Sequence, residues 1–221
     1  MIRRDYILRM IEEFCQMLSR LSALKKGQLW REAGATVDEE FQRLIGAGPE
    51  AISRFSEAEL LAKLIQGEPT QVVHQKALML TTLLKEAGDV ATAEERAEES
   101  RAYYLKALYL LLDVLARGEV AEFPEFVPRV EALVGALSDE PLPPQIQVVL
   151  MQHYERAGEF GKAEDALFGL FEAERENPNL LDFGIAFYER LKSQSDASLS
   201  AGNLPRAELE ASLGELRRRK K

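Results

Sequence analysis

Histidine and cysteine are the side chains that most readily bind a transition metal or exchange a proton near neutral pH, and this chain has only three of them. His74 and His153 lie far apart in the sequence. A metal site on one helix needs ligands three or four residues apart. No carboxylate lies at that distance from His74, and none follows His153 at that distance. We therefore expect both histidines to be packing or surface residues rather than ligands.

Other patterns typical of catalysis are also missing from the sequence. Cys15 falls on an apolar helical face, where a buried structural thiol is expected. The serines lie outside any nucleophile-elbow context, and we find neither a Walker glycine loop nor a dinucleotide fingerprint. The acidic cluster at 94–99 contains no histidine and is typical of a solvated turn. The sequence thus predicts a protein that is not an enzyme and has no cofactor and no metal.

The charge balance limits the classes of partner. The 221 residues carry a net charge of −9, and the last five residues contribute +5, which leaves −14 for the rest. An acidic body repels phosphates, so we expect no nucleic-acid partner. No apolar run reaches transmembrane length, and a single cysteine cannot form an internal disulfide. These features predict a cytoplasmic protein with little membrane contact.

The chain is rich in Leu, Ala and Glu and poor in β-branched residues, which predicts an all-α fold. Ser56 and Glu59 form a predicted capping box, and Gly67 with Pro69 marks a break. The proline-rich segment 138–144 is a predicted linker between an N-terminal region, 1–137, and a C-terminal region, 145–221, although one continuous domain is also compatible. Helices are expected at about 3–25, 28–45, 50–55, 57–65, 70–92, 97–117, 128–137, 145–157, 160–176, 180–193 and 204–218, with a loop at 193–202.

The first helix has a wide apolar stripe from Ile7 to Leu24. The simplest interpretation is a terminal helix packed on its neighbours. The stripe is nearly heptad, so a homodimer interface is a second interpretation, and the helix's charge of +3 allows a third, peripheral contact with a membrane surface.

Two segments resemble tetratricopeptide repeats. In the unit at about 145–177, the matching residues are Leu150, Tyr154, Gly158, Phe160 and Ala163. In the unit at about 73–117, the matching residues are Gly88, Tyr104, Ala107 and Leu108, while Glu95 replaces the expected turn glycine and Ser100 the expected alanine. The resemblance implies antiparallel helix pairs stacked as a right-handed helical array.

The N-terminal stretch Met-Ile-Arg-Arg-Asp-Tyr-Ile, with segments 85–89 and 104–108, also resembles a bacterial family of unknown function that carries tetratricopeptide-like helices. This second resemblance covers roughly the first half of the chain. It implies a bacterial cytosolic protein and supplies no activity.

The tetratricopeptide resemblance implies a groove lined by the inward positions of the first helices. Its candidate residues have mixed charge, which suits a peptide or a partner helix: they are Lys85, Asp89, Gln145, Gln152, Glu155 and Arg156. The expected function is therefore a protein–protein interaction module or scaffold. The alternative is a structural or regulatory homodimer assembled through the N-terminal helix.

Overall fold

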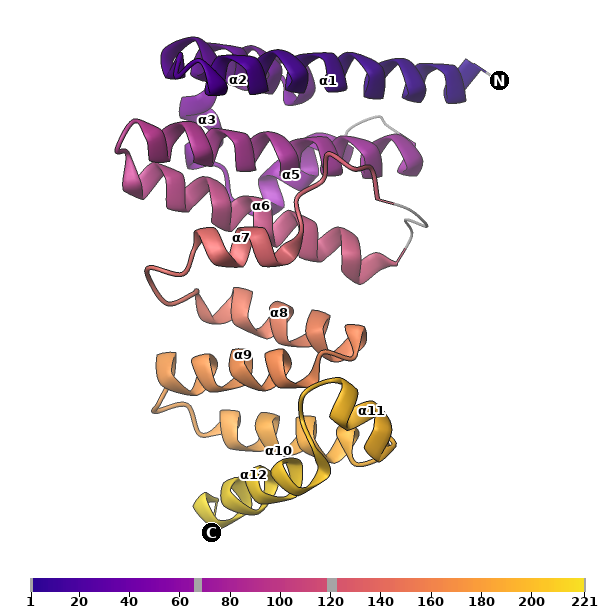
Figure 1. The fold of residues 1–221 in the computed structure, drawn as a ribbon, viewed down its shortest axis with the longest axis vertical. Helices are drawn as coiled ribbons and strands as arrows, with labels where there is room; N and C mark the ends of the chain where they lie inside the picture. The colour runs from indigo at the N-terminus through magenta and orange to yellow at the C-terminus, as the bar shows by residue number, and fades with distance from the viewer. Residues whose placement is uncertain (1, 66–68, 119–122, 221) are drawn as a thin grey trace. The chain divides into compact units, whose positions relative to one another are not determined.

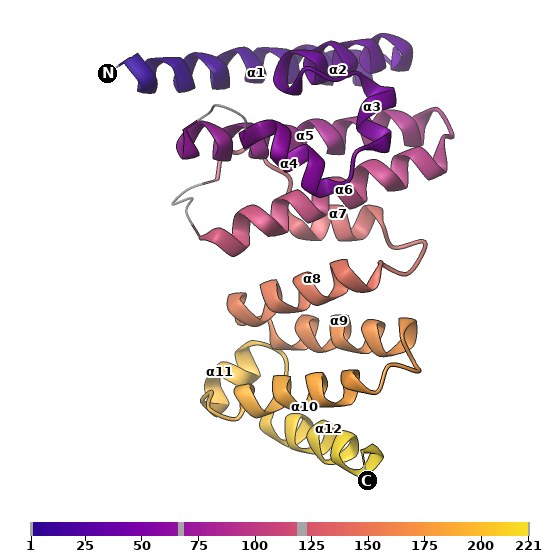
Figure 2. The ribbon, with the colours of Figure 1, turned by 180° about the vertical axis from the view of Figure 1, so that it is seen from behind.

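The computed structural model describes residues 2–65, 69–118 and 123–220, so Gly67 and Lys221 lie outside the described part. The described residues form twelve α-helices and no strand, and 79% of these residues are helical. The all-α prediction is therefore confirmed. The chain divides into two compact units, residues 1–139 and 140–221, and the division falls within the proline-rich segment 138–144. Figures 1 and 2 show the helices of both units from opposite sides.

Unit 1 is built on two antiparallel helix pairs (Figure 1). The most extensive helix contact in unit 1 is between α5 (Thr70–Ala93) and α6 (Ala97–Arg117), and α2 (Trp30–Ile45) packs on α5. Leucines dominate this contact because both helices bury a wide apolar face. The helices of unit 1 are α1 (Ile2–Lys26), α2 (Trp30–Ile45), α3 (Pro49–Arg54), α4 (Glu57–Ile65), α5 (Thr70–Ala93), α6 (Ala97–Arg117) and α7 (Val130–Ala136).

Two local features of unit 1 show why these residues fold this way. The capping box is confirmed: the Ser56 amide donates to Glu59 Oε2 at 2.8 Å, and the Glu59 amide donates to Ser56 Oγ at 3.3 Å. Gly88 of α5 faces the Tyr104 ring of α6, and a Cβ there would be 2.7 Å from Tyr104 Cε1. The glycine therefore permits the tyrosine ring to lie directly on α5.

Unit 2 contains α8 (Pro144–Ala157), α9 (Phe160–Ala173), α10 (Asn179–Leu191), α11 (Asp196–Ala201) and α12 (Arg206–Arg219). Two sequence predictions were wrong here. The second helix ends at Ala173 instead of about 176, and the predicted loop 193–202 contains α11. Helix α11 begins because the Ser195 side chain accepts a hydrogen bond from the Ser198 amide at 3.1 Å. Leu199 then anchors the short helix in the core.

A backbone contact joins two turns of unit 2. The Gly161 amide donates to the Gly202 carbonyl oxygen at 2.8 Å. A Cβ on Gly202 would lie 2.3 Å from the carbonyl oxygen of Gly158, so only glycine fits at this position. The α8–α9 turn and the α11–α12 turn are thereby held together.

Three helix pairs, α1–α2, α5–α6 and α8–α9, share one turn geometry. Each turn has one residue in the left-handed conformation, with φ of +56° at Gln28, +59° at Glu95 and +77° at Gly158. The following amide donates to the carbonyl five positions earlier: Leu29 to Leu24 at 3.0 Å, Arg96 to Ala91 at 2.8 Å and Glu159 to Tyr154 at 2.9 Å. The same residues, Leu29, Arg96 and Glu159, are helix N-caps with φ of −87°, −94° and −90° and ψ of 64°, 68° and 64°. Glu95 thus adopts the same left-handed turn conformation as Gly158.

This geometry predicts that Glu95→Gly stabilises the protein. The left-handed conformation costs a non-glycine residue about 1–2 kcal/mol, and the greater freedom of glycine in the unfolded chain cancels part of that gain. We expect a net increase of about 0.5–1 kcal/mol in the free energy of unfolding, measured by urea denaturation. As a control, Glu12→Gly in the middle of α1 should lower it by about 1 kcal/mol. Loss of stability in Glu95→Gly would contradict the turn assignment.

Candidate functional site

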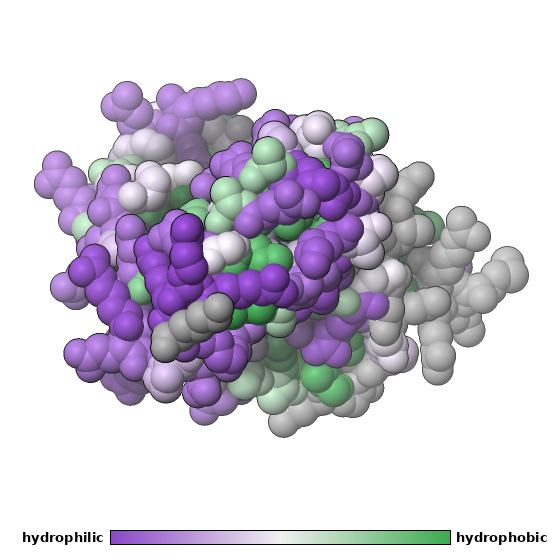
Figure 3. Space-filling model, turned by 90° about the horizontal axis from the view of Figure 1, so that it is seen from below, coloured by the Kyte–Doolittle hydropathy of each residue, from purple (hydrophilic) through white to green (hydrophobic). Residues whose placement is uncertain are grey.

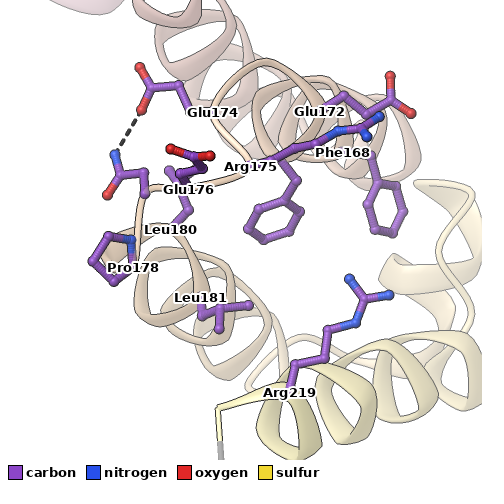
Figure 4. Close-up of a pocket in the computed structure, with 11 residues that line it drawn as sticks. Phe168, Glu172, Glu174, Arg175, Glu176, Pro178, Leu180, Leu181 and Arg219 are labelled. Atoms are coloured by element: carbon purple, nitrogen blue, oxygen red, sulfur yellow. Dashed lines mark hydrogen bonds between the residues drawn. The ribbon is translucent and has the colours of Figure 1, made fainter.

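Unit 2 contains a solvent-open pocket of about 590 Å³ between the end of α9, the start of α10 and the end of α12. Figure 4 shows its lining side chains. The pocket combines apolar and charged groups: it is lined by Phe168, Phe171, Glu172, Glu174, Arg175, Glu176, Asn177, Pro178, Leu180, Leu181 and Arg219. A volume of this size accommodates several residues of a peptide or a small molecule.

The α9–α10 connection creates the pocket. Helix α9 stops at Ala173 and α10 starts at Asn179, so a longer turn links them than links α8 and α9. Asn177 fixes this turn: its Nδ2 donates to Glu174 Oε2 at 2.7 Å, and its Oδ1 accepts from the Asn179 amide at 3.1 Å. Gly184 lets α10 approach its neighbours, since a Cβ there would lie 2.8 Å from both Phe171 Cζ and Leu216 Cδ1.

The apolar part of the pocket is open to solvent. Phe168 has 45% of its surface exposed, whereas Leu180 has only 9% exposed. In Figure 4, Phe168, Leu181 and Arg219 point toward the open centre, while the Glu172 and Glu174 carboxylates turn away from it. Figure 3 views the side of the molecule where α12 lies and shows a mostly hydrophilic face around a smaller apolar area. The arrangement can hold an apolar side chain next to a guanidinium group.

Sequence reasoning missed this pocket, because none of the six predicted groove residues lines it. One signal was available. The buried face of α9 follows Phe160, Ala163, Leu167 and Leu170, and Phe168 is a large apolar residue beside that stripe. The pocket itself depends on where α12 ends relative to α9, and no local pattern predicts that.

Four of the predicted residues lie on α8 in unit 2. Gln145, Gln152 and Arg156 are exposed. Glu155 is half-buried and accepts two hydrogen bonds from Arg190, from Nε at 2.8 Å and from Nη2 at 2.7 Å. The Arg190 contact makes Glu155 part of the packing between α8 and α10.

The other two predicted residues, Lys85 and Asp89, belong to a half-buried ionic cluster in unit 1. Lys85 Nζ lies 2.8 Å from Asp89 Oδ2 and 3.0 Å from Glu86 Oε1. Lys25 of α1 pairs with Asp89 and, at 2.6 Å, with Glu86. Tyr104 Oη donates to Asp89 Oδ1 at 2.8 Å. The cluster ties α1 to the α5–α6 pair, so these two side chains have partners within their own chain.

The cluster shifts the ionisation of its members. Burial alone would raise the pKa of Asp89, but hydrogen bonds from Lys25 and Lys85 outweigh burial and hold that pKa below its usual value. Burial likewise opposes the charge on Lys85, yet bonding to Asp89 and the charge of Glu86 raise the pKa of Lys85. Burial, aided by the bond to Asp89, raises the pKa of Tyr104 to about 12.

Glu164 is a buried carboxylate of unit 2, at 7% exposure. Tyr188 Oη donates to Glu164 Oε1 at 2.6 Å. Burial is the main reason that the pKa of Glu164 is raised, and the hydrogen bond from Tyr188 partly offsets this effect. Glu164 is not among the residues that line the unit 2 pocket.

The cysteine and the two histidines, the remaining residues considered for chemistry, do not come together in one site. Cys15 is exposed, which corrects the expectation of a buried thiol. It follows the fully buried Phe14, and one residue turns a helix by about 100°, so its side chain faces away from the core. His74 lines an apolar pocket of about 210 Å³ in unit 1, and the His153 ring lies 5.4 Å from that of Tyr154. Among the described residues, no group of His, Cys, Asp or Glu could hold a metal ion.

The ionic cluster predicts that Asp89→Asn destabilises the protein at neutral pH, by about 1–3 kcal/mol, because two lysines lose one of the two carboxylates that they share. Asp89 has a lower pKa folded than unfolded, so its contribution is present above the unfolded value of about 3.9 and is lost as pH falls through the folded value. Urea unfolding is measured at pH 7 and in steps below pH 4. The difference in free energy of unfolding between wild type and Asp89→Asn should become smaller as the pH falls.

A matched control is Asp113→Asn, which removes the exposed pair with Arg117 within one helix. We expect a change of at most about 0.5 kcal/mol for this variant. A pH-independent effect of Asp89→Asn, or one no larger than that of the control, would contradict the stabilising role of the cluster.

Comparison with known proteins gives a family and no function. Searches of curated proteins and of solved structures found no match. In the described part of the chain, no helix is long and apolar enough to cross a membrane. A family model described as "Family of unknown function (DUF6483)" matches residues 1–221, the whole length rather than the first half alone. The chain therefore belongs to this family of unknown function, DUF6483.

Proposed function

We propose that this protein is a protein–protein interaction module without catalytic activity, and that it binds a segment of a partner protein in the unit 2 pocket. The observation that carries the proposal is Phe168, which is 45% exposed at the edge of a 590 Å³ pocket. Burying a phenylalanine side chain contributes about 1.5–3 kcal/mol. A partner that covers Phe168 would gain this free energy, and Leu180 and Leu181 supply further apolar contact.

A role without chemistry agrees with the setting of two carboxylates whose pKa values are shifted. Asp89 is neutralised by Lys25 and Lys85, and Glu164 is held by Tyr188. Each is engaged by its own chain, as expected for groups that stabilise a fold. Catalytic acids and bases need room for a substrate within hydrogen-bond reach.

We also infer that the helix pairs follow a tetratricopeptide-like, right-handed arrangement in a bacterial cytoplasmic protein. The shared left-handed turn residues Gln28, Glu95 and Gly158 support the repeat relationship. The contact of Gly88 with Tyr104 supports it too, because both stand at positions that resemble the repeat pattern.

The binding proposal is tested by selecting random twelve-residue peptides displayed on phage against the full chain. We expect peptides with Kd values of about 1–100 µM, since the pocket is much smaller than a stable protein interface. Phe168→Ser should raise the Kd of these peptides about 10–100-fold, which corresponds to the loss of a buried aromatic side chain. Phe123→Ser is the matched control, because Phe123 is exposed to 38% in unit 1. Selection of no peptide, or of peptides that bind both variants equally, would refute the proposal.

The alternative function, a homodimer through α1, is favoured by a separate observation. Helix α1 has 25 residues and α2 has 16, so α1 extends about 13 Å beyond its partner at 1.5 Å per residue. The extension carries Tyr6 and Leu8, exposed to 50% and 49%. Two such ends could cover each other in a symmetric pair.

The homodimer proposal predicts a dimer in analytical ultracentrifugation at micromolar concentration. Leu8→Glu should shift the equilibrium toward the monomer at least tenfold, about 1.4 kcal/mol, because a charge would enter the contact. Leu29→Glu, at a leucine exposed to 47% outside α1, should leave the equilibrium unchanged. A monomer at all concentrations, or equal effects of both substitutions, would exclude this assembly.

A further inference from the structure

The unit 2 pocket presents one cationic group, Arg219, on its α12 side. Arg219 points toward the open centre (Figure 4), and it follows Arg217 and Arg218 at the end of α12. The only partner of Arg219 in the described part of the chain is Glu215, on the same helix. Both members of this pair are more than half exposed, at 61% and 54%. Such a surface pair is weak and is readily exchanged for another carboxylate.

The opposite side of the pocket is less suited to an anion. Glu172 and Glu176 belong to the end of α9 and the turn after it, and Glu174 is bound to Asn177. Arg175 lies between these glutamates in sequence and offsets part of their charge. An anionic group of a ligand is therefore expected next to Arg219, on the α12 side.

From this arrangement we propose that the pocket recognises an acidic peptide segment with one large apolar residue. The apolar residue lies between Phe168 and Leu181, and a flanking Asp or Glu replaces Glu215 as the partner of Arg219. A planar guanidinium can bind a carboxylate through two parallel hydrogen bonds, which fixes the orientation of the segment. This inference rests on the proposed function and adds the chemical class of the partner segment.

Two phage libraries separate this inference from the binding proposal itself. Both have a central Phe, Leu or Trp, and the flanking positions are Asp, Glu, Ser or Gly in one library and Lys, Arg, Ser or Gly in the other. We expect only the acidic library to yield peptides that bind the full chain and lose binding to Phe168→Ser. Phe168-dependent peptides from the basic library alone, or equally from both, would overturn the inference but leave the binding proposal intact. No Phe168-dependent peptide from either library would overturn both.

A charge exchange tests the contact with Arg219 directly. Arg219→Glu should lower the affinity for an acidic peptide at least tenfold, measured by fluorescence anisotropy. Replacing the flanking Glu of the peptide by Lys should restore most of the affinity for the Arg219→Glu variant. The control is Arg218→Glu, because Arg218 is the exposed neighbour on α12 and does not line the pocket. Circular dichroism verifies that each variant is folded. Equal losses with both variants would show that general charge rather than this contact determines recognition, and no recovery with the lysine peptide would show that the flanking residue does not contact position 219; either result would overturn the inference.

Discussion

A single left-handed residue between antiparallel helices is the constraint on which the fold depends. In the tight turns between antiparallel helices, one residue with positive φ lets the chain reverse within a few residues while the last carbonyls of the first helix still find donors. Gln28, Glu95 and Gly158 fill this position, and the following residue has nearly the same backbone conformation in all three turns. The apolar faces of each pair can then meet along most of their length.

The pocket lies where this constraint is relaxed. The connection from α9 to α10 has no described residue with positive φ and is longer than the α8–α9 turn. Helix α9 packs more extensively on α8 than on α10, and α10 packs on α12. Part of the α9 surface, including Phe168, therefore stays exposed to solvent. The same unit contains both a tight pair that gives stability and an open junction that is available to a ligand.

Much of the secondary structure was predictable from sequence, because it depends on local patterns. The capping box at Ser56, the helix ends at Gly118 and Gly158, and the long amphipathic helices all follow from residue type and spacing. Helix α11 was missed because Ser195 and Asp196 at its start are typical of loops until Ser195 is recognised as the N-cap.

The candidate site was not predictable, because it depends on contacts between distant residues. Lys25 lies more than 60 positions from Glu86 and Asp89, so no spacing rule assigns it to them. Arg219 enters the pocket of Phe168 only because α12 returns past the end of α9. Cys15 was expected to be buried because the sequence pattern assigns it to the apolar face of the first helix, and the structure places it on the exposed side.

Hydrogen–deuterium exchange of the full chain tests the central claim, that the unit 2 pocket is a binding site for a protein segment. The measurement compares the free protein with the protein saturated by a selected peptide. We predict slower amide exchange in residues 168–184 and at the end of α12, with unchanged exchange in α1 and α2. Protection confined to unit 1, or no protection around Phe168 at saturation, would contradict the account.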